Sequence, residues 1–266
     1  MKTIFCLSEA FREGSDGYFQ RISACIVFFV VVHVGAKVAS NWSPLLASRP
    51  TVVGATIHGV LTSWLALAVT IGAIDLSWWP YAGLPLSLGY LATDIVFYCI
   101  PKRDVTITCH HLVMAICHFT SGTTAGAAAS GVGDSAWAQW TSVLGYLSEL
   151  PNPLLNTRWF MLKTLKEHSF IYSLNNFLLL VTWVGSRLVV LPCNIIFRIL
   201  PRLSEFAADG AYDLLGWLLA GHVIIILLSL DWLSKLLRGG LRSYFVFDPK
   251  AGPGFNPNVV QTKKVN

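Results

Sequence analysis

Two adjacent histidines, His110 and His111, lie in a stretch of the chain that carries no formal charge. The run from Val105 to Gly133 contains no Asp, Glu, Lys or Arg. An imidazole ring can act as a base, a nucleophile or a metal ligand. Ionisable groups in hydrocarbon cost roughly 2.5–3.5 kcal/mol each on insertion scales, so a buried set of them indicates a functional site.

The spacing of these histidines predicts two faces of one helix. His111, Met114 and His118 are spaced i, i+3, i+7 and share a face, whereas His110 lies about 100° around the helix. One histidine can therefore face a cavity while its neighbour contacts another helix, and the sequence does not decide which. Both could instead be structural. The HExxH spacing typical of a zinc site is absent, so we predict no metal site.

A carboxylate and two amides follow at helical spacing. Glu149, Asn152 and Asn156 are spaced i, i+3, i+7. A buried carboxylate needs a partner or must be protonated, and His110 or His111 would serve. A histidine–carboxylate pair orients the ring and stabilises its cation, as in acyl-transfer chemistry. The alternative is a hydrogen-bonded pair that only locks two helices together.

The other polar residues in apolar stretches have less specific patterns, and most of them are expected to be structural. Arg187 is expected to be an interfacial anchor near the end of its helix. The single histidines His33, His58 and His222 are expected to be structural, and the six cysteines, which have no CxxC spacing, to be small core residues. Tyr90, Asp94 and Tyr98 repeat at i+4, so Asp94 should face the interior. The predicted catalytic candidates are His110, His111 and Glu149, and the predicted binding residues are Asp94, Tyr98, Asn152, Asn156 and His118.

Composition indicates a membrane protein that would hold these residues in a helical bundle. The 266-residue chain is 54% hydrophobic and only 12% charged, against about 25% charged in soluble domains. Charge-free stretches at Pro50–Ile74, Ser169–Ser186 and Leu214–Leu230 each approach the ~20 residues that cross a bilayer as a helix. The net charge of +5 does not indicate nucleic-acid binding, because the basic residues sit at helix ends.

The fold class expected is an all-α, polytopic membrane protein with about seven transmembrane helices. Pro101 should end the third helix and Pro192 the sixth, and Pro151 and Pro153 should kink the fifth. The helices are expected at about 19–38, 51–74, 84–100, 105–127, 136–156, 169–191 and 211–236. Residues 1–18 are expected to be a non-cytosolic segment with no cleaved signal peptide, residues 19–240 the bundle, and residues 241–266 a disordered cytosolic tail.

Charge between the helices predicts the orientation. The first, third and fifth loops each hold basic residues, the second and fourth hold none, the sixth holds Arg198 and Arg202, and the tail is basic. Because cytoplasmic loops carry the excess of Lys and Arg, the C-terminus is expected in the cytosol. There, Lys263-Lys264-Val265-Asn266 matches a dilysine retrieval signal, which predicts residence in the endoplasmic reticulum and recognition by coat proteins.

These residues together resemble a known family. Tyr90-x3-Asp94-x3-Tyr98, the pair His110-His111, and the stretch from Glu149 through Pro151-Asn152-Pro153 to Asn156-Thr-Arg158-Trp159 resemble the TLC-domain family over roughly residues 50–240. That family includes ceramide synthases, translocon-associated proteins and TLC-domain-containing lipid-homeostasis proteins, and the last group resembles this chain most. The resemblance implies a six-helix membrane barrel around a long cavity, preceded by a leading helix.

The resemblance implies two forms of a lipid function. In ceramide synthases, one paired histidine would transfer an acyl group from acyl-coenzyme A to a sphingoid amine, and His110 and His111 match that pair. The synthase motif ends in His-Asp-x-x-Asp; those aspartates are missing here, and Glu149 with Asn152 stands in that region. The chain is therefore expected to act in membrane lipid homeostasis, either as an acyltransferase without a bound cofactor or as a non-catalytic lipid-binding, sensing or trafficking protein. A transporter is disfavoured because the two halves do not resemble each other.

Overall fold

The computed structural model describes residues 16–122, 135–164, 169–208 and 212–245, and these residues form helices and turns without a β-strand. The chain divides into two compact units, Met1–Ser229 and Leu230–Asn266. Five helical segments of the described residues are long and apolar enough to cross a membrane, and Val105–Cys117 is a shorter apolar helix. The expectation of an all-α, polytopic membrane protein is confirmed.

The first unit begins with a leading helix and the first helix of the bundle. Helix α2 covers Asp16–Ala39, and the short α3 covers Pro44–Ser48. Helix α4 covers Val52–Thr70. It passes close to a later helix at Gly59, where an added Cβ would lie 3.2 Å from Cδ of Pro153. Glycine at this position therefore permits close packing of α4 against α10, which positions the polar residues described below.

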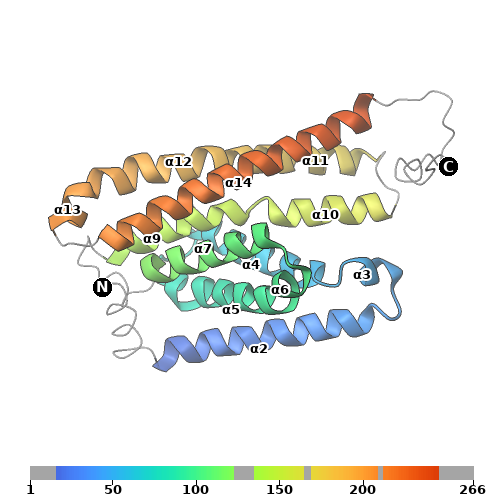
Figure 1. Cartoon of the computed structure of the whole chain (residues 1–266), viewed down its shortest axis with the longest axis horizontal. Helices are drawn as coiled ribbons and strands as arrows, with labels where there is room; N and C mark the ends of the chain where they lie inside the picture. Colours follow the sequence, from blue (N-terminus) through green and yellow to red (C-terminus); the bar gives the residue numbers. More distant parts are fainter. Residues whose placement is uncertain (1–15, 123–134, 165–168, 209–211, 246–266) are drawn as a thin grey trace. The chain divides into compact units, whose positions relative to one another are not determined.

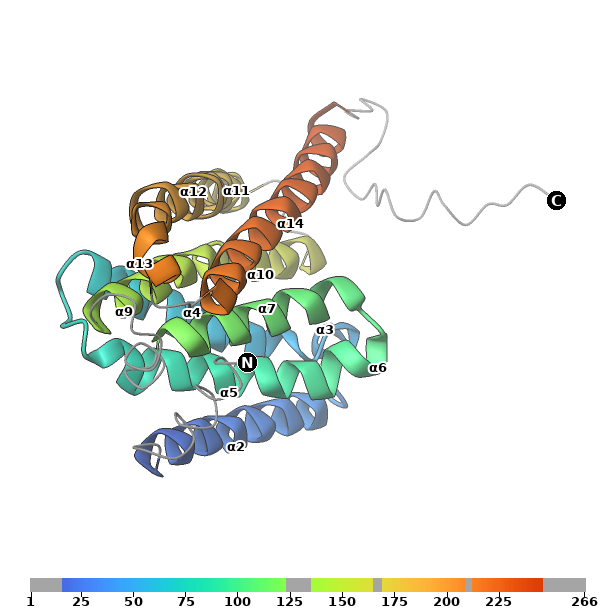
Figure 2. The same cartoon turned by 60° about the vertical axis from the view of Figure 1, so that its left-hand side comes forward.

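The third segment is continuous but not uniformly α-helical. It consists of the π turn η1 (Trp79–Gly83), α5 (Leu84–Asp94), the π turn η2 (Ile95–Cys99) and α6 (Ile100–Lys102). Helix α5 packs along α2 (Figures 1 and 2). The π turn η2 changes which side chains share a face with Asp94.

The fourth and fifth segments carry the paired histidines and the glutamate. Helix α7 (Val105–Gly122) begins after Asp104, whose Oδ1 accepts a hydrogen bond from the Ile107 amide at 3.0 Å. Helix α9 (Ser135–Tyr146) is followed by the 3₁₀ turn η3 (Leu147–Glu149) and by α10 (Asn152–Lys163). The fifth segment is thus interrupted near Pro151 and Pro153, as predicted. It ends at Lys163 and not at about residue 156.

The predicted end of the sixth helix at Pro192 is wrong. The segment runs on through α11 (Phe170–Trp183), the π turn η4 (Val184–Val190), α12 (Leu191–Asn194), the π turn η5 (Ile195–Ile199), the 3₁₀ turn η6 (Leu200–Arg202) and α13 (Leu203–Ala208). Pro192 lies in the first turn of α12, directly after a π turn. A proline is tolerated there because its missing N–H would have no helical partner.

The last helix, α14 (Tyr212–Phe245), extends from the first unit into the second. In the first unit, the Trp183 indole of α11 donates to the carbonyl of Ser229 at 3.1 Å. The second unit carries an exposed ion pair between Lys235 and Asp231. The core of the first unit is aromatic as well as aliphatic: Trp79 is fully buried, and its indole donates to Ser142 Oγ of α9 at 3.0 Å.

Candidate functional site: two buried histidine–carboxylate pairs

The first pair joins α7 to the interrupted fifth segment. Nε2 of His110 lies 3.6 Å from Oε1 of Glu149, and both side chains are buried. The other carboxylate oxygen, Oε2, accepts a hydrogen bond from Nδ2 of Asn152 at 2.5 Å. The 3₁₀ turn η3 ends at Glu149 and α10 begins at Asn152. The break in the helix therefore holds a carboxylate and an amide together against His110.

A third imidazole, which the sequence analysis treated as a structural singleton, completes this group. Nδ1 of His58 in α4 lies 4.0 Å from Oε2 of Glu149. Its Nε2 lies 3.0 Å from Oγ of Ser87, and its ring stacks on Tyr90 with centroids 4.1 Å apart. His58 is held from two sides, as a structural residue would be, and it also faces the carboxylate. Its single position in an apolar run gave no signal of this.

Arg187, which was predicted to be an interfacial anchor, is buried instead. The side chain is 1% exposed. Its Nε donates to the carbonyl of Ser148 at 2.7 Å, and its NH2 donates to Oδ1 of Asn152 at 2.9 Å. The misplaced helix end at Pro192 caused the error, because it put Arg187 close to the end of the helix. In the segment that reaches Ala208, Arg187 lies near the middle.

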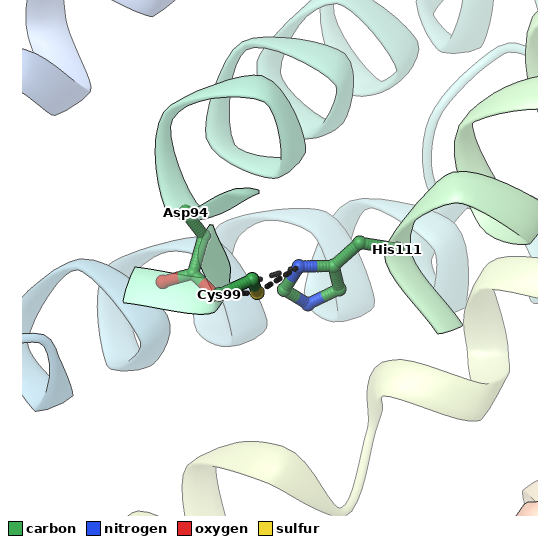
Figure 3. A group of neighbouring side chains, drawn as sticks. All are labelled: Asp94, Cys99 and His111. Carbon is green, nitrogen blue, oxygen red and sulfur yellow. Dashed lines mark hydrogen bonds and ion pairs between the residues drawn. The ribbon is translucent and has the colours of Figure 1, made fainter. Parts of the chain in front are cut away.

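The second pair lies on the third segment and α7. Nδ1 of His111 lies 3.5 Å from Oδ2 of Asp94, which is the last residue of α5. Sγ of Cys99 lies 3.7 Å from the same carboxylate oxygen and 3.7 Å from the same ring nitrogen (Figure 3). The two neighbouring histidines thus face different carboxylates. Cys99, which was assigned to the core by its type alone, is fully buried between the two.

The remaining predicted binding residues do not all lie in the two histidine–carboxylate groups. Asn152 belongs to the Glu149 group, and Asn156 is buried on α10. Tyr98 is half-buried, and the adjacent Cys99, not Tyr98, contacts Asp94, because the π turn η2 breaks the i+4 repeat. The side chain of His118 lies outside the described residues. Asn175 of α11 donates to the carbonyl of Leu154 of α10 at 3.0 Å.

A small pocket opens beside the first pair. Along α7 its lining begins one turn after His110, with Val113, Met114 and Cys117, and it includes Ser148, the residue before Glu149. His110, Met114 and Cys117 share one face of α7. Helices α12 and α14 supply the opposite wall through Leu191, Gly221, His222 and Ile225. The sequence also predicted that His110 or His111, together with Glu149 and Asp94, would line one cavity. None of these residues belongs to this lining, although His110 precedes its first residue by one turn of α7.

Comparison with known proteins identifies the family of the chain. The family model described as TLC domain matches residues 50–238, which include both histidine–carboxylate pairs, Arg187 and the pocket. No solved structure matches the chain. Because the family model covers more than half of the 266 residues, the chain belongs to the TLC-domain family.

Proposed function

We propose that this protein is a membrane acyltransferase that moves an acyl group from acyl-coenzyme A to an amine or hydroxyl group of a lipid. The observation that carries the proposal is the buried His110–Glu149 pair, which adjoins in the chain two residues that line a small pocket, Val113 and Ser148. Membership of the TLC-domain family supports a role connected with membrane lipids. A sphingoid base is the first acceptor to test, because the family resemblance includes ceramide synthases.

In this proposal, Glu149 orients His110 and His110 carries the proton. Nε2 of the ring faces the carboxylate, so Nδ1 is the nitrogen that would accept a proton from the acceptor. As that N–H or O–H bond breaks, the acceptor attacks the thioester carbon and a C–N or C–O bond forms. The C–S bond then breaks, and His110 returns the proton to the coenzyme A thiolate. Glu149 stabilises the imidazolium between these two events.

The supporting residues explain how a charged base could exist in an apolar bundle. Asn152 fixes Oε2 of Glu149, and Arg187 fixes Oδ1 of the same asparagine. A guanidinium close to the carboxylate offsets part of the cost of burying its charge. The separation of 3.6 Å between His110 and Glu149 is longer than a hydrogen bond. Such contacts are often long without substrate and tighten when it binds.

The test is turnover by the purified full-length protein in lipid vesicles. Release of coenzyme A thiol would be measured with a long-chain acyl donor and a panel of sphingoid and lysolipid acceptors. His110→Ala and Glu149→Gln are each expected to lower the rate on the order of 10²-fold, the usual scale for removing a general base. Cys109→Ala is the matched control, because Cys109 precedes His110 and is exposed. Absence of turnover in the wild type, or an unchanged rate in His110→Ala, would refute acyl transfer.

One observation favours a second candidate, lipid binding or sensing without chemistry. The group around Glu149 connects α4, α7, α10 and the sixth segment through polar contacts, as a purely structural lock would. In that case lipid would copurify with the protein and be identified by mass spectrometry, while acyl-coenzyme A would not be consumed. His110→Ala would then lower thermal stability without any catalytic effect.

The compartment we propose is the endoplasmic reticulum membrane, with coat proteins as the partner. The support is the dilysine pattern of Lys263-Lys264-Val265-Asn266. Changing both lysines to serine should shift the protein onward to the Golgi, as seen by fluorescence microscopy of an N-terminally tagged chain. A wild-type chain found at the cell surface would refute the proposal.

A further inference from the structure

Asp94, Cys99 and His111 place three atoms of metal-ligand type in one small triangle. Oδ2 of Asp94, Nδ1 of His111 and Sγ of Cys99 are separated by 3.5, 3.7 and 3.7 Å, and each atom takes part in two of these distances. Figure 3 shows the side chains of Asp94 and Cys99 directed toward the His111 ring from the neighbouring segment. Each of the three atoms thus contacts both of the others, as the ligands of one metal ion would.

The edges of the triangle fit three ligands of one metal ion. The N···O separation of 3.5 Å exceeds the normal hydrogen-bond range of about 2.7–3.2 Å. Tetrahedral zinc has bonds of about 2.0–2.2 Å to nitrogen and oxygen and about 2.3 Å to sulfur, which gives edges of roughly 3.4 Å for N···O and roughly 3.6 Å for edges to sulfur. The observed edges therefore agree with those of zinc ligands to about 0.1 Å.

A local irregularity of the backbone creates the triangle. Asp94 and Cys99 are five residues apart, a spacing that places two side chains about 140° apart on a regular α-helix. The π turn Ile95–Cys99 lies between them, and its i→i+5 hydrogen bonds bring residues five apart onto one face. π turns inside α-helices are rare and frequent at functional sites. The π turn thus lies at the point of the third segment where it brings Asp94 and Cys99 onto one face.

Charge and chemistry both favour a divalent ion of the zinc type. A thiolate and a carboxylate would neutralise a doubly charged ion, and the imidazole would bind as a neutral ligand. A neutral site avoids most of the cost of burying charge among apolar helices. Sulfur and nitrogen ligands favour zinc over calcium or magnesium, which prefer oxygen. Binding would release the thiol proton of Cys99 to solvent.

We propose that Asp94, Cys99 and His111 bind a zinc ion, with a fourth coordination position left for water or for a carbonyl oxygen of a lipid substrate. Three protein ligands plus one open position is the pattern of catalytic rather than structural zinc sites. A zinc ion there would polarise a carbonyl group as a Lewis acid. This site replaces the sequence-based expectation of no metal, and it is independent of acyl transfer by His110 and Glu149.

The first test measures metal directly. Full-length protein purified in detergent, stripped with a chelator and reloaded with Zn²⁺, should hold about one zinc per chain by inductively coupled plasma mass spectrometry. Asp94→Asn, Cys99→Ser and His111→Ala should each weaken zinc binding by more than about tenfold, because each removes a ligand. Cys109→Ser, an exposed cysteine of α7, and Cys193→Ser should bind zinc as the wild type does.

The second test begins with the wild-type protein, and its first readout therefore remains decisive if the three ligand variants aggregate. Wild-type protein loaded with Co²⁺ should show the near-ultraviolet charge-transfer band of a cobalt–thiolate bond. Cys99→His, which replaces one ligand by another, should keep the bound metal and lose this band. Substoichiometric metal in the reloaded wild type, a cobalt spectrum without the thiolate band, or full zinc in all three ligand variants would overturn the proposal. Each readout is independent of whether the protein turns over acyl-coenzyme A.

Discussion

Asn152 connects the residues of the first pair more than any other side chain. It donates to Glu149 through Nδ2 and accepts from Arg187 through Oδ1, so both ends of one amide are used. Arg187 in turn contacts the Ser148 carbonyl, which lies one residue before Glu149. The orientation of the carboxylate toward His110 therefore depends on a residue of the sixth segment. Buried polar groups joined in this way stabilise a fold only while every partner is present.

Replacing Arg187 by methionine should therefore destabilise the protein strongly. The change keeps the length of the side chain but leaves the Ser148 carbonyl and Oδ1 of Asn152 without their donors, which should cost about 2 kcal/mol or more. The measurement is the loss of monodisperse protein in detergent after heating. Arg187→Lys should be intermediate, because an ammonium group lacks the planar fork that reaches both acceptors.

The matched control for that experiment is Arg202→Met. Arg202 is partly exposed, pairs with Glu205 at 2.9 Å and lies over the Trp137 ring; at such surface positions each of these contacts contributes about 1 kcal/mol or less. Its melting profile should therefore stay close to that of the wild type. If Arg187→Met melted like Arg202→Met, the buried contacts of Arg187 would contribute little to the fold, and the position of Glu149 would need another explanation.

The sequence predicts which segments are long, apolar helices, but it does not predict where π turns interrupt them. Hydropathy and charge-free length indicated seven segments, and each has a helical counterpart among the described residues. The prolines at 151 and 153 also indicated the break that holds Glu149. The π turns η2 and η4 leave no comparable signal: η2 is as apolar as its neighbours, and the Gly185-Ser186-Arg187 stretch of η4 does not distinguish a π turn from an α-helix. The π turn η2 brings Cys99, and not Tyr98, to Asp94, and the continuation of the sixth segment past Pro192 places Arg187 in its buried middle.

The two carboxylate pairs show the same limit within the site. The rarity of charge in apolar runs was enough to single out Asp94, Glu149 and the two histidines. Which histidine faces which carboxylate depends on how α7 is rotated against α5 and the η3 turn, and helical spacing within α7 does not contain that information. His58 was missed for a related reason, since its approach to Glu149 depends on the close packing of α4 against α10 at Gly59.

Over the first unit as a whole, four of the arginine–aromatic contacts lie near helix ends, unlike the buried contact of Arg187 with Trp183. At one end of the bundle Arg49 lies over the Trp159 ring at 5.8 Å, and Arg158 lies over the Tyr172 ring at 6.0 Å. At the other end Arg21 lies over Tyr81 at 4.0 Å, and Arg202 lies over Trp137 at 5.1 Å. The first and fifth connections thus share an end, as expected of helices that alternate in direction. Arg198 and Arg202, expected in a loop, belong instead to the extended sixth segment.

This arrangement gives a prediction of orientation that single cysteines can test. The first, third and fifth connections hold Lys and Arg, whereas the connection between α4 and the third segment holds none, so the former should face the cytosol. In sealed endoplasmic reticulum vesicles, a membrane-impermeant maleimide should label Lys102→Cys beyond the wild-type level. Ser77→Cys, also exposed but in the connection without basic residues, should be labelled only after detergent is added. The opposite pattern would invert the orientation, and it would place Lys263 and Lys264 on the side where coat proteins could not read them.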